Sequence, residues 1–144
     1  MTATRFVTAQ TSQTDAINAV ADLANQNGQA SIVAKSGATT TLTAAEMVNT
    51  VIQQSGTNGA LSVATATAAA LVAALKNAQA NSVFDMAILN TNDNTVTLTA
   101  GDGVTLSGTT AVPTNKSQIY RGIVTNAASG SEAVTLVGLL KAPV

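Results

Sequence analysis

The sequence predicts a mainly β protein, an antiparallel β-sandwich or jelly-roll-like domain with two or three short helices and an N-terminal arm. From residue 81 to 140, apolar residues alternate with Thr, Ser and other polar residues in short runs that turn residues separate. This period of two is typical of strands that bury one face. Earlier in the chain, apolar residues recur at helical spacing, but only over short stretches. We therefore predict an attachment arm and helix over 1–28 and a sandwich domain with short helices over 29–144.

The chain is unusually poor in charge. Six basic and seven acidic residues make up 9% of it and leave a net charge of −1, against roughly 25% charged residues in an average soluble protein. A free monomer of this kind lacks the repulsion that keeps proteins apart in solution. We therefore expect Thr, Ser, Asn and Gln side chains to supply the missing hydration, and we also expect much of the surface to be covered by copies of the chain or by another protein.

Several function classes lack the residues that they need. The sequence has no histidine and no cysteine, which removes most groups used for proton transfer, thiol chemistry and metal binding. The basic residues are scattered from Arg5 to Lys141 and form no patch, so we expect no nucleic-acid binding. The longest apolar run, residues 68–75, is far shorter than the roughly 20 residues of a membrane span. Residues 1–10 contain no apolar stretch of the kind found in a secretory signal. We expect neither an enzyme nor a cofactor, a metal or a membrane partner.

The N-terminal segment has the features of an attachment element. Residues 1–12 are polar and Thr-rich around one apolar pair, which is typical of an extended arm that docks on another surface. A helix is predicted from Thr14 because apolar residues then recur on one face until Asn27-Gly28 supplies a left-handed stop. The candidate attachment residues are Phe6, Val7, Ile17, Val20 and Leu23.

Short elements follow over residues 31–59. The runs 31–35 and 39–42 are β-like and lie on either side of Ser36-Gly37. A helix is predicted from Thr43, since the Thr43 hydroxyl and the Glu46 carboxylate can satisfy backbone N–H groups reciprocally. Its apolar face is expected to consist of Met47, Val48, Val51 and Ile52, and the cluster 55–59 ends it.

One more strand and one more helix precede the β-rich region. Residues 61–64 are compatible with a strand. Thr65 or Thr67 is then placed to cap a short Ala-rich helix that ends at Lys76-Asn77. Its larger side chains, Leu71, Val72 and Leu75, fall on one side, so we expect this helix to lie against a sheet.

The period-two region supplies the remaining strands. Three of them are predicted from the alternating residues Phe84, Met86, Ile88, then Val96 and Leu98, then Val104 and Leu106. The turns 90–94 and 100–103 are expected to join them as hairpins, with Gly101 and Gly103 allowing the positive φ that tight turns need. Residues 118–125 and 132–140 complete the set around the loop 126–131. The last strand is apolar on both faces, which predicts a central position or cover by another subunit.

Two groups of polar residues are candidate sites. Asp93, with Asn90, Asn92, Asn94 and Asp102, places oxygens of the type that Ca²⁺ prefers near two turns. The same residues are also ordinary turn formers without EF-hand spacing, and we favour that structural role. Asp85 lies in an apolar strand and is expected to pair with Arg121 across the sheet rather than to act as an acid.

The residues from about 65 to 140 carry a resemblance to a known group of proteins. In order, the segments are TATAAALVAAL, VFDMAILNT, NTVTLTAGDGVTLSGTTAV, a polar turn around Asn115, SQIYRGIVTNA and GSEAVTLVGLL. This succession resembles a small β-domain that recurs in tailed-phage virion proteins. The hairpin-like NTVTLTAGDGVTLSGT is its most recognisable piece, and residues 1–64 show no comparable likeness.

The resemblance implies a structural role in a virion. Proteins of this group are capsid decoration, cement, head-fibre or spike components and are commonly homotrimeric. The resemblance therefore implies a homotrimer that binds the major capsid protein or another virion protein on the capsid exterior after synthesis in the host cytoplasm. We further expect the attachment residues of the arm and first helix, which the resemblance does not cover, to face the capsid. The alternative is a receptor- or glycan-binding head-fibre or spike module, which would use the loops 90–94 and 126–131 and an exposed aromatic side chain.

Overall fold

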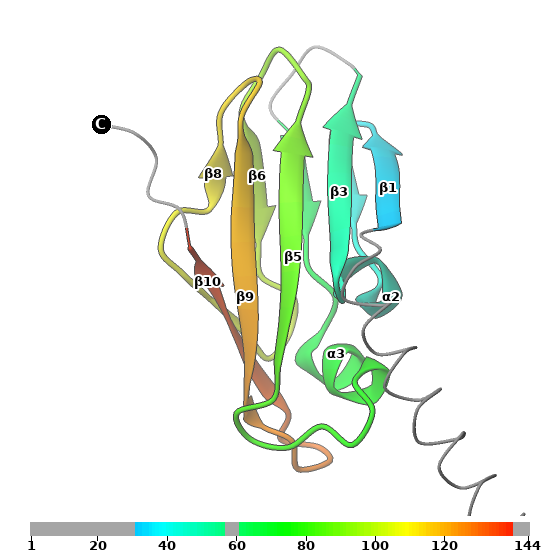
Figure 1. Cartoon of the computed structure of the whole chain (residues 1–144), viewed down its shortest axis with the longest axis vertical. Helices are drawn as coiled ribbons and strands as arrows, with labels where there is room; N and C mark the ends of the chain where they lie inside the picture. The colour runs from blue at the N-terminus through cyan, green and yellow to red at the C-terminus, as the bar shows by residue number, and fades with distance from the viewer. Residues whose placement is uncertain (1–30, 57–60, 140–144) are drawn as a thin grey trace, which may run out of the picture. The chain divides into compact units, whose positions relative to one another are not determined.

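The structure, a computed structural model, describes residues 31–56 and 61–139 (Figure 1). The chain divides into two compact units, and the described residues all belong to the second, Ser31–Val144. The predicted arm and first helix lie outside the described residues, and so do the candidate attachment residues Phe6, Val7, Ile17, Val20 and Leu23.

Two β-sheets make up most of the described chain. The six-stranded sheet has the order β1 (Ser31–Ser36), β3 (Thr50–Ser55), β5 (Val83–Asn90), β9 (Ser117–Asn126), β10 (Ala133–Gly138), β7 (Val104–Ser107). The four-stranded sheet has the order β2 (Thr39–Thr41), β4 (Leu61–Ala64), β6 (Val96–Thr99), β8 (Ala111–Val112). In Figure 1 the strand β6 lies behind β5 and β9, and β8 is drawn to the left of β9. The predicted mainly β, sandwich-like fold is confirmed.

The strands are connected differently from the prediction. The first six strands pass alternately between the two sheets, and β1–β3–β5 and β2–β4–β6 each pair in parallel. Antiparallel pairs join β5 to β9, β9 to β10 and β6 to β8, while β10 and β7 pair in parallel. The sheets are therefore mixed rather than purely antiparallel.

The turns 90–94 and 100–103 accordingly do not form the expected hairpins. Each joins a strand of one sheet to a strand of the other. The alternating pattern identifies the buried face of a strand, but it does not identify the strand that pairs with it. Helices lie in two of the crossovers, α2 (Ala44–Met47) between β2 and β3 and α3 (Ala68–Ala74) between β4 and β5. They supply the length that a parallel connection requires.

The core lies between the sheets and is aliphatic. Its largest fully buried side chains include Tyr120, Leu42, Met47, Ile52 and Leu61, and Phe84 is the other aromatic side chain of the described core. Burial alternates along β5, β6 and β9 as the period of two predicts. The inward positions of the sequence pattern are therefore the positions that build the core.

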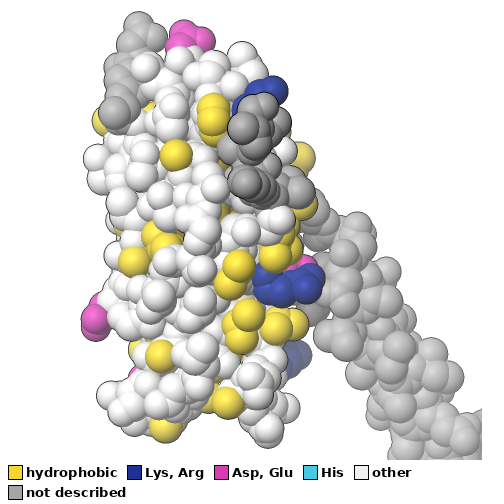
Figure 2. Space-filling view, turned by 90° about the vertical axis from the view of Figure 1, so that its left-hand side faces the viewer, with side chains coloured by type: hydrophobic (Ala, Val, Ile, Leu, Met, Phe, Trp, Pro, Cys, Tyr) yellow, Lys and Arg dark blue, Asp and Glu magenta, His cyan; other side chains and the backbone are white. Residues whose placement is uncertain are grey.

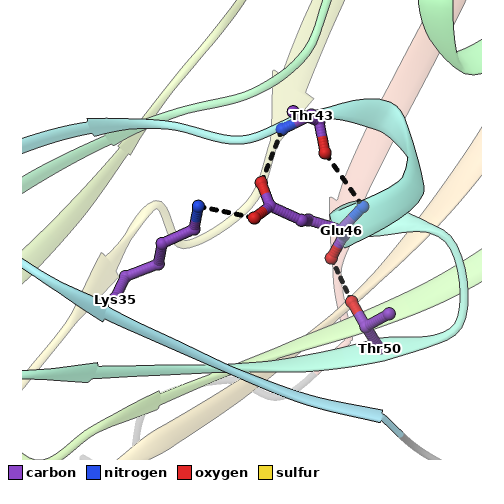
Figure 3. A network of polar contacts seen from close by, with 4 residues as sticks. All are labelled: Lys35, Thr43, Glu46 and Thr50. Carbon is purple, nitrogen blue, oxygen red and sulfur yellow. Dashed lines mark hydrogen bonds and ion pairs between the residues drawn. The ribbon is translucent and has the colours of Figure 1, made fainter.

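Helix α2 begins as predicted but is much shorter. Thr43 is its N-cap, and a capping box joins Thr43 and Glu46 reciprocally (Figure 3). The Lys35 ammonium on β1 contacts the same carboxylate at 2.5 Å, and the Thr50 hydroxyl donates to the Glu46 carbonyl. Together these contacts connect the helix to β1 and β3.

The predicted continuation of this helix to Ile52 is wrong. Asn49 adopts a positive φ of 56°, and its N–H and side-chain oxygen pair with the backbone of Asp85 on β5. Thr50–Ser55 is then a strand between β1 and β5. A four-residue helix contributes little by itself, whereas a β-branched run placed between two strands gains two ladders of backbone hydrogen bonds.

Helix α3 and the turn that packs against it agree more closely with the sequence. Thr67 caps the helix, Leu71 is fully buried, and Val72 and Leu75 pack against the core. Of the two turn glycines, Gly103 has a positive φ of 71°. Gly101 is needed for a different reason, since a Cβ there would lie 2.6 Å from the carbonyl oxygens of Thr65 and Ala66.

Within residues 31–56 and 61–139, no helix has both the length and the apolar character needed to cross a membrane.

Candidate interaction surface

The two outer faces of the sandwich have different chemistry. The outward side chains of the four-stranded sheet are mostly hydroxyls: Thr39, Thr41, Ser62, Thr97 and Thr99. On β3, β5 and β9 of the six-stranded sheet, half of the outward side chains are aliphatic and the rest are polar or charged. Hydroxyl-bearing strands keep a surface hydrated without charge, so the aliphatic side is the candidate for contact with another molecule.

A row of aliphatic side chains crosses four strands of the six-stranded sheet and continues just beyond the end of a fifth. The backbone register places Ile32 beside Val51, Val51 beside Ala87, and Ala87 beside Ile119. Leu139, just after β10, continues the row because its N–H donates to the Ile119 carbonyl at 2.9 Å. We call Ile32, Val51, Ala87, Ile119 and Leu139 the aliphatic row.

The most exposed large apolar side chains of the described residues all lie on this face. Ile32 is 65% exposed, Val83 56%, Leu139 47% and Ile119 40%. Val83 pairs in register with Ile123, at a different level along the strands from the aliphatic row. Exposed apolar side chains that gather on one face, as the neighbouring members of the aliphatic row do, are typical of an interaction surface.

One ion pair interrupts the apolar surface. Asp85 on β5 and Arg121 on β9 are direct cross-strand partners. The guanidinium donates two parallel hydrogen bonds to the carboxylate, of 2.9 and 3.0 Å. This confirms the predicted pair across the sheet. The hydrogen bonds to the Asp85 carboxylate, and then the negative charge of this carboxylate, raise the pKa of Arg121 above the ordinary value.

The ion pair remains accessible. Its side chains are 48% and 50% exposed, so solvent screens their attraction and the pair contributes little to folding. Figure 2 views the sandwich from the left-hand side of Figure 1 and shows how sparse charged side chains are among the apolar and uncharged ones. A half-exposed ion pair within an apolar face is therefore better suited to orienting a partner than to holding the fold together.

The two-sided apolar pattern predicts that β10 is central or covered by another subunit, and the structure places it second from the edge of the six-stranded sheet. It lies between β9 and β7, and its inward Val134 and Leu136 are buried. Its outward Thr135 and Val137 stay partly exposed. The described residues therefore leave the outer side of this strand partly open.

The Asn-rich turn before β6 is organised by its own hydrogen bonds. The buried Asn90 amide donates to the carbonyls of Asn94 and Val112, and its oxygen accepts from the Asn92 N–H. The Asn92 oxygen accepts from the Asn94 N–H, and its amide donates to the Gly56 carbonyl. The Asn90 and Asn92 oxygens considered as calcium ligands are thus already used as hydrogen-bond acceptors.

The two turns of that candidate calcium site do not come together. The turn 90–94 precedes β6 and the turn 100–103 follows it, so they lie at opposite ends of the strand. Among the described residues, no group of three or more acidic, His or Cys side chains is close enough to hold a metal ion. We interpret the turn as a structural element.

Only part of the aliphatic row is visible in the sequence. Strand β9 is apolar on both faces, with Ile119 and Ile123 outward and Tyr120 and Val124 inward. The prediction of an outer face covered by another subunit concerns only the last strand, although β9 has the same two-sided pattern. Because the row combines residues from four strands and one residue that follows β10, it can be seen only once the register is known.

In comparisons with known proteins, no family model, no curated protein and no solved structure matches the chain.

Proposed function

We propose that this chain is a structural protein of a virion, which decorates or cements the capsid and assembles as a homotrimer. The observation that carries the proposal is the contrast between the two outer faces, a hydroxyl-rich one and one that combines exposed aliphatic side chains with a single ion pair. A face of the second kind can be buried against another subunit without stripping water from isolated charges. The homotrimer and the capsid as target come from the resemblance of residues 65–140 to phage virion proteins.

The proposed action is mechanical. Subunits bury aliphatic sheet surface against one another, and residues Phe6, Val7, Ile17, Val20 and Leu23 attach the assembly to the major capsid protein or another virion protein on the capsid exterior. Separating neighbouring capsomers would then require the exposure of this buried surface, which opposes disassembly of the shell.

The described aromatic side chains favour this role over receptor or glycan recognition. A sugar-binding loop usually offers an exposed aromatic ring for stacking, but Phe84 and Tyr120 are 3% and 1% exposed. Neither lies in the loops 90–94 or 126–131 that the alternative would use. The head-fibre or spike module therefore remains the second hypothesis.

Co-sedimentation with shells tests the proposal. The full-length chain is mixed with empty capsids of the phage that encodes it, and the pellet is assayed for the chain. We expect saturable binding, which the variant Val20→Glu weakens while its oligomeric mass stays unchanged. A matched polar substitution in the same segment, Asn18→Glu, is the control and should still bind. A chain that stays entirely in the supernatant would contradict the proposal.

A further inference from the structure

We infer that the outer face of the six-stranded sheet joins copies of this chain around an axis that runs parallel to β5 and β9. The face comprises the aliphatic row and the Asp85–Arg121 pair. The inference rests on the proposed function, since it assumes that the chain assembles with itself. It goes further by naming the surface, the direction of the axis and the charged groups that meet.

The positions of the residues along the strands support this axis. Residues that pair in register lie at the same height along the strands, which we call a level. The aliphatic row occupies one level along the strands because its members are register partners. Rotation about an axis parallel to the strands leaves every residue at its own level. The row of one copy therefore meets the row of the next, and apolar groups are buried against apolar groups. An axis across the strands would keep only the level through which it passes, so the aliphatic row and the ion pair could not both meet their own counterparts.

The ion pair is complementary to itself under the same rotation. Asp85 lies on β5 and Arg121 on the adjacent β9, at one level. Copies that face each other around an axis between these strands bring Asp85 of one copy toward Arg121 of the next. The pair uses only two of the five N–H donors of a guanidinium. Each copy therefore retains donors and acceptors for its neighbour, and the charges alternate around the axis.

The size of the face is sufficient for a stable contact. Six strands about 4.8 Å apart and about six residues long present a sheet area of roughly 500 Å². The protruding side chains add further surface to this value. A specific interface needs about 1,000 Å² in total over both partners. One sheet face of this size from each copy therefore meets the requirement.

Charge also distinguishes a further copy from other occupants. The Asp85 and Arg121 charges cancel, so the face offers no net attraction to an anionic lipid surface or to a strongly charged protein. A second copy of the chain, rotated about this axis, presents an acceptor opposite each donor and a donor opposite each acceptor. The occupant to which we commit is therefore a second copy, and the measured mass gives the number of copies.

Sedimentation equilibrium of the full-length chain provides the first test. We expect the wild type to have a mass that is a multiple of the 14.3 kDa protomer. Ile119→Glu places a charge within the aliphatic row and should give monomers with an unchanged circular dichroism spectrum. Thr97→Glu is the matched control, since it places the same charge on an exposed strand position of the other sheet, and it should keep the wild-type mass.

Charge exchange provides a second test that loss of folding cannot imitate. Asp85→Arg and Arg121→Asp should each weaken self-association at least about tenfold, because like charges then meet across the contact. Mixing the two variants should restore association at the contacts that join one variant to the other, since the two arginines of one variant would face the two aspartates of the other. Mixed oligomers are detected by labelling one variant with a fluorophore.

The results separate this inference from the proposed function. A monomeric wild type, a wild-type mass in Ile119→Glu, or no rescue on mixing would overturn the inference. If wild-type chains are monomeric and Ile119→Glu abolishes capsid binding, the face belongs to a capsid protein instead and the inference is likewise overturned. If the oligomer forms through this face but ignores capsids, the inference stands and the virion role fails.

Discussion

Phe84 lies over Gly122, its direct cross-strand neighbour on β9. A Cβ built at position 122 would be 2.8 Å from Cε2 of the Phe84 ring and closer still to Cε1 and Cζ. Phe84 is 3% exposed, so its ring has little room to move aside. The absence of a side chain at 122 is therefore what allows one of the few aromatic groups of the core to lie flat on the sheet.

Gly122→Ala should therefore destabilise the protein. Overpacking of a filled core typically costs about 1–3 kcal/mol, and we expect a loss in this range in urea unfolding. The same substitution in a Phe84→Leu background should cost clearly less, because the ring that it meets is gone. Equal costs in the two backgrounds would show that the two residues are not coupled.

Tyr120 gives a prediction about alkaline pH. Burial raises the pKa of its phenol to about 12, from an ordinary value of 10.0. The unfolded chain therefore loses this proton first as the pH rises. Stability should be unaffected by this group below pH 10 and should fall between pH 10 and 12. Because Tyr120 is the single tyrosine of the sequence, tyrosinate absorbance reports its ionisation directly.

Tyr120→Phe is the matched variant. The Tyr120 hydroxyl is buried and has no hydrogen-bond partner within the described part of the chain. Its removal spares the cost of burying an unpaired polar group. We expect the variant to be at least as stable as the wild type at neutral pH and to lose the decline that this phenol causes above pH 10. A destabilisation of several kcal/mol would instead indicate a partner for the hydroxyl.

The Thr43–Glu46 capping box should be detectable in acid. The hydrogen bond from Lys35, and then that from the Thr43 N–H, lowers the pKa of the Glu46 carboxyl below its ordinary value of 4.5. This contribution to stability is fully present above pH 4.5 and is lost as the pH falls through the lowered pKa of the folded state. Glu46→Gln should therefore reduce the acid dependence of thermal unfolding below pH 4.5. If the unfolding temperature of this variant falls with decreasing pH as steeply as that of the wild type, the prediction is contradicted.

Thr43→Ala tests the other half of the same box. Loss of an N-cap side chain typically costs about 1 kcal/mol, and we expect this loss at neutral pH. Thr41→Ala is the control, since this outward threonine of β2 caps no helix. A similar loss in both variants would assign the effect to strand propensity rather than to the cap.

Local patterns in the sequence were sufficient for many of the individual elements. The strands around Phe84, Val96 and Val104 follow from alternation. The caps at Thr43 and Thr67 follow from the ability of a Thr side chain to accept a backbone hydrogen bond. These features depend on residues a few positions apart, which a sequence displays directly.

Features that depend on distant residues were missed. The segment from Met47 to Ile52 has helical spacing, yet its second half is a strand because β1 and β5 lie on either side of it. Gln54 is fully buried and donates to the Gly37 carbonyl, so a polar residue occupies an inward strand position and hides the alternation. Strand partners, and with them the aliphatic row, are likewise set by packing across the whole domain.

Substitutions in the turn around Asn90 distinguish a structural role of this turn from a metal-binding role. The Asn90 amide, itself 0% exposed, donates to the Asn94 and Val112 carbonyls at 2.8 and 2.9 Å. Asn90→Ala leaves both carbonyls without this donor, and each buried unpaired group costs about 1–3 kcal/mol. We therefore expect a large drop in the unfolding temperature.

Asp93→Ala is the matched substitution in the same turn, since Asp93 is exposed. It should leave the unfolding temperature nearly unchanged, because surface substitutions without specific contacts usually have small effects. Millimolar Ca²⁺ should likewise not shift the wild-type transition, since the neighbouring Asn oxygens are already used as acceptors within the turn. A calcium-dependent rise in the unfolding temperature that Asp93→Ala removes would instead establish a metal site, because a ligand that binds only the folded state stabilises it.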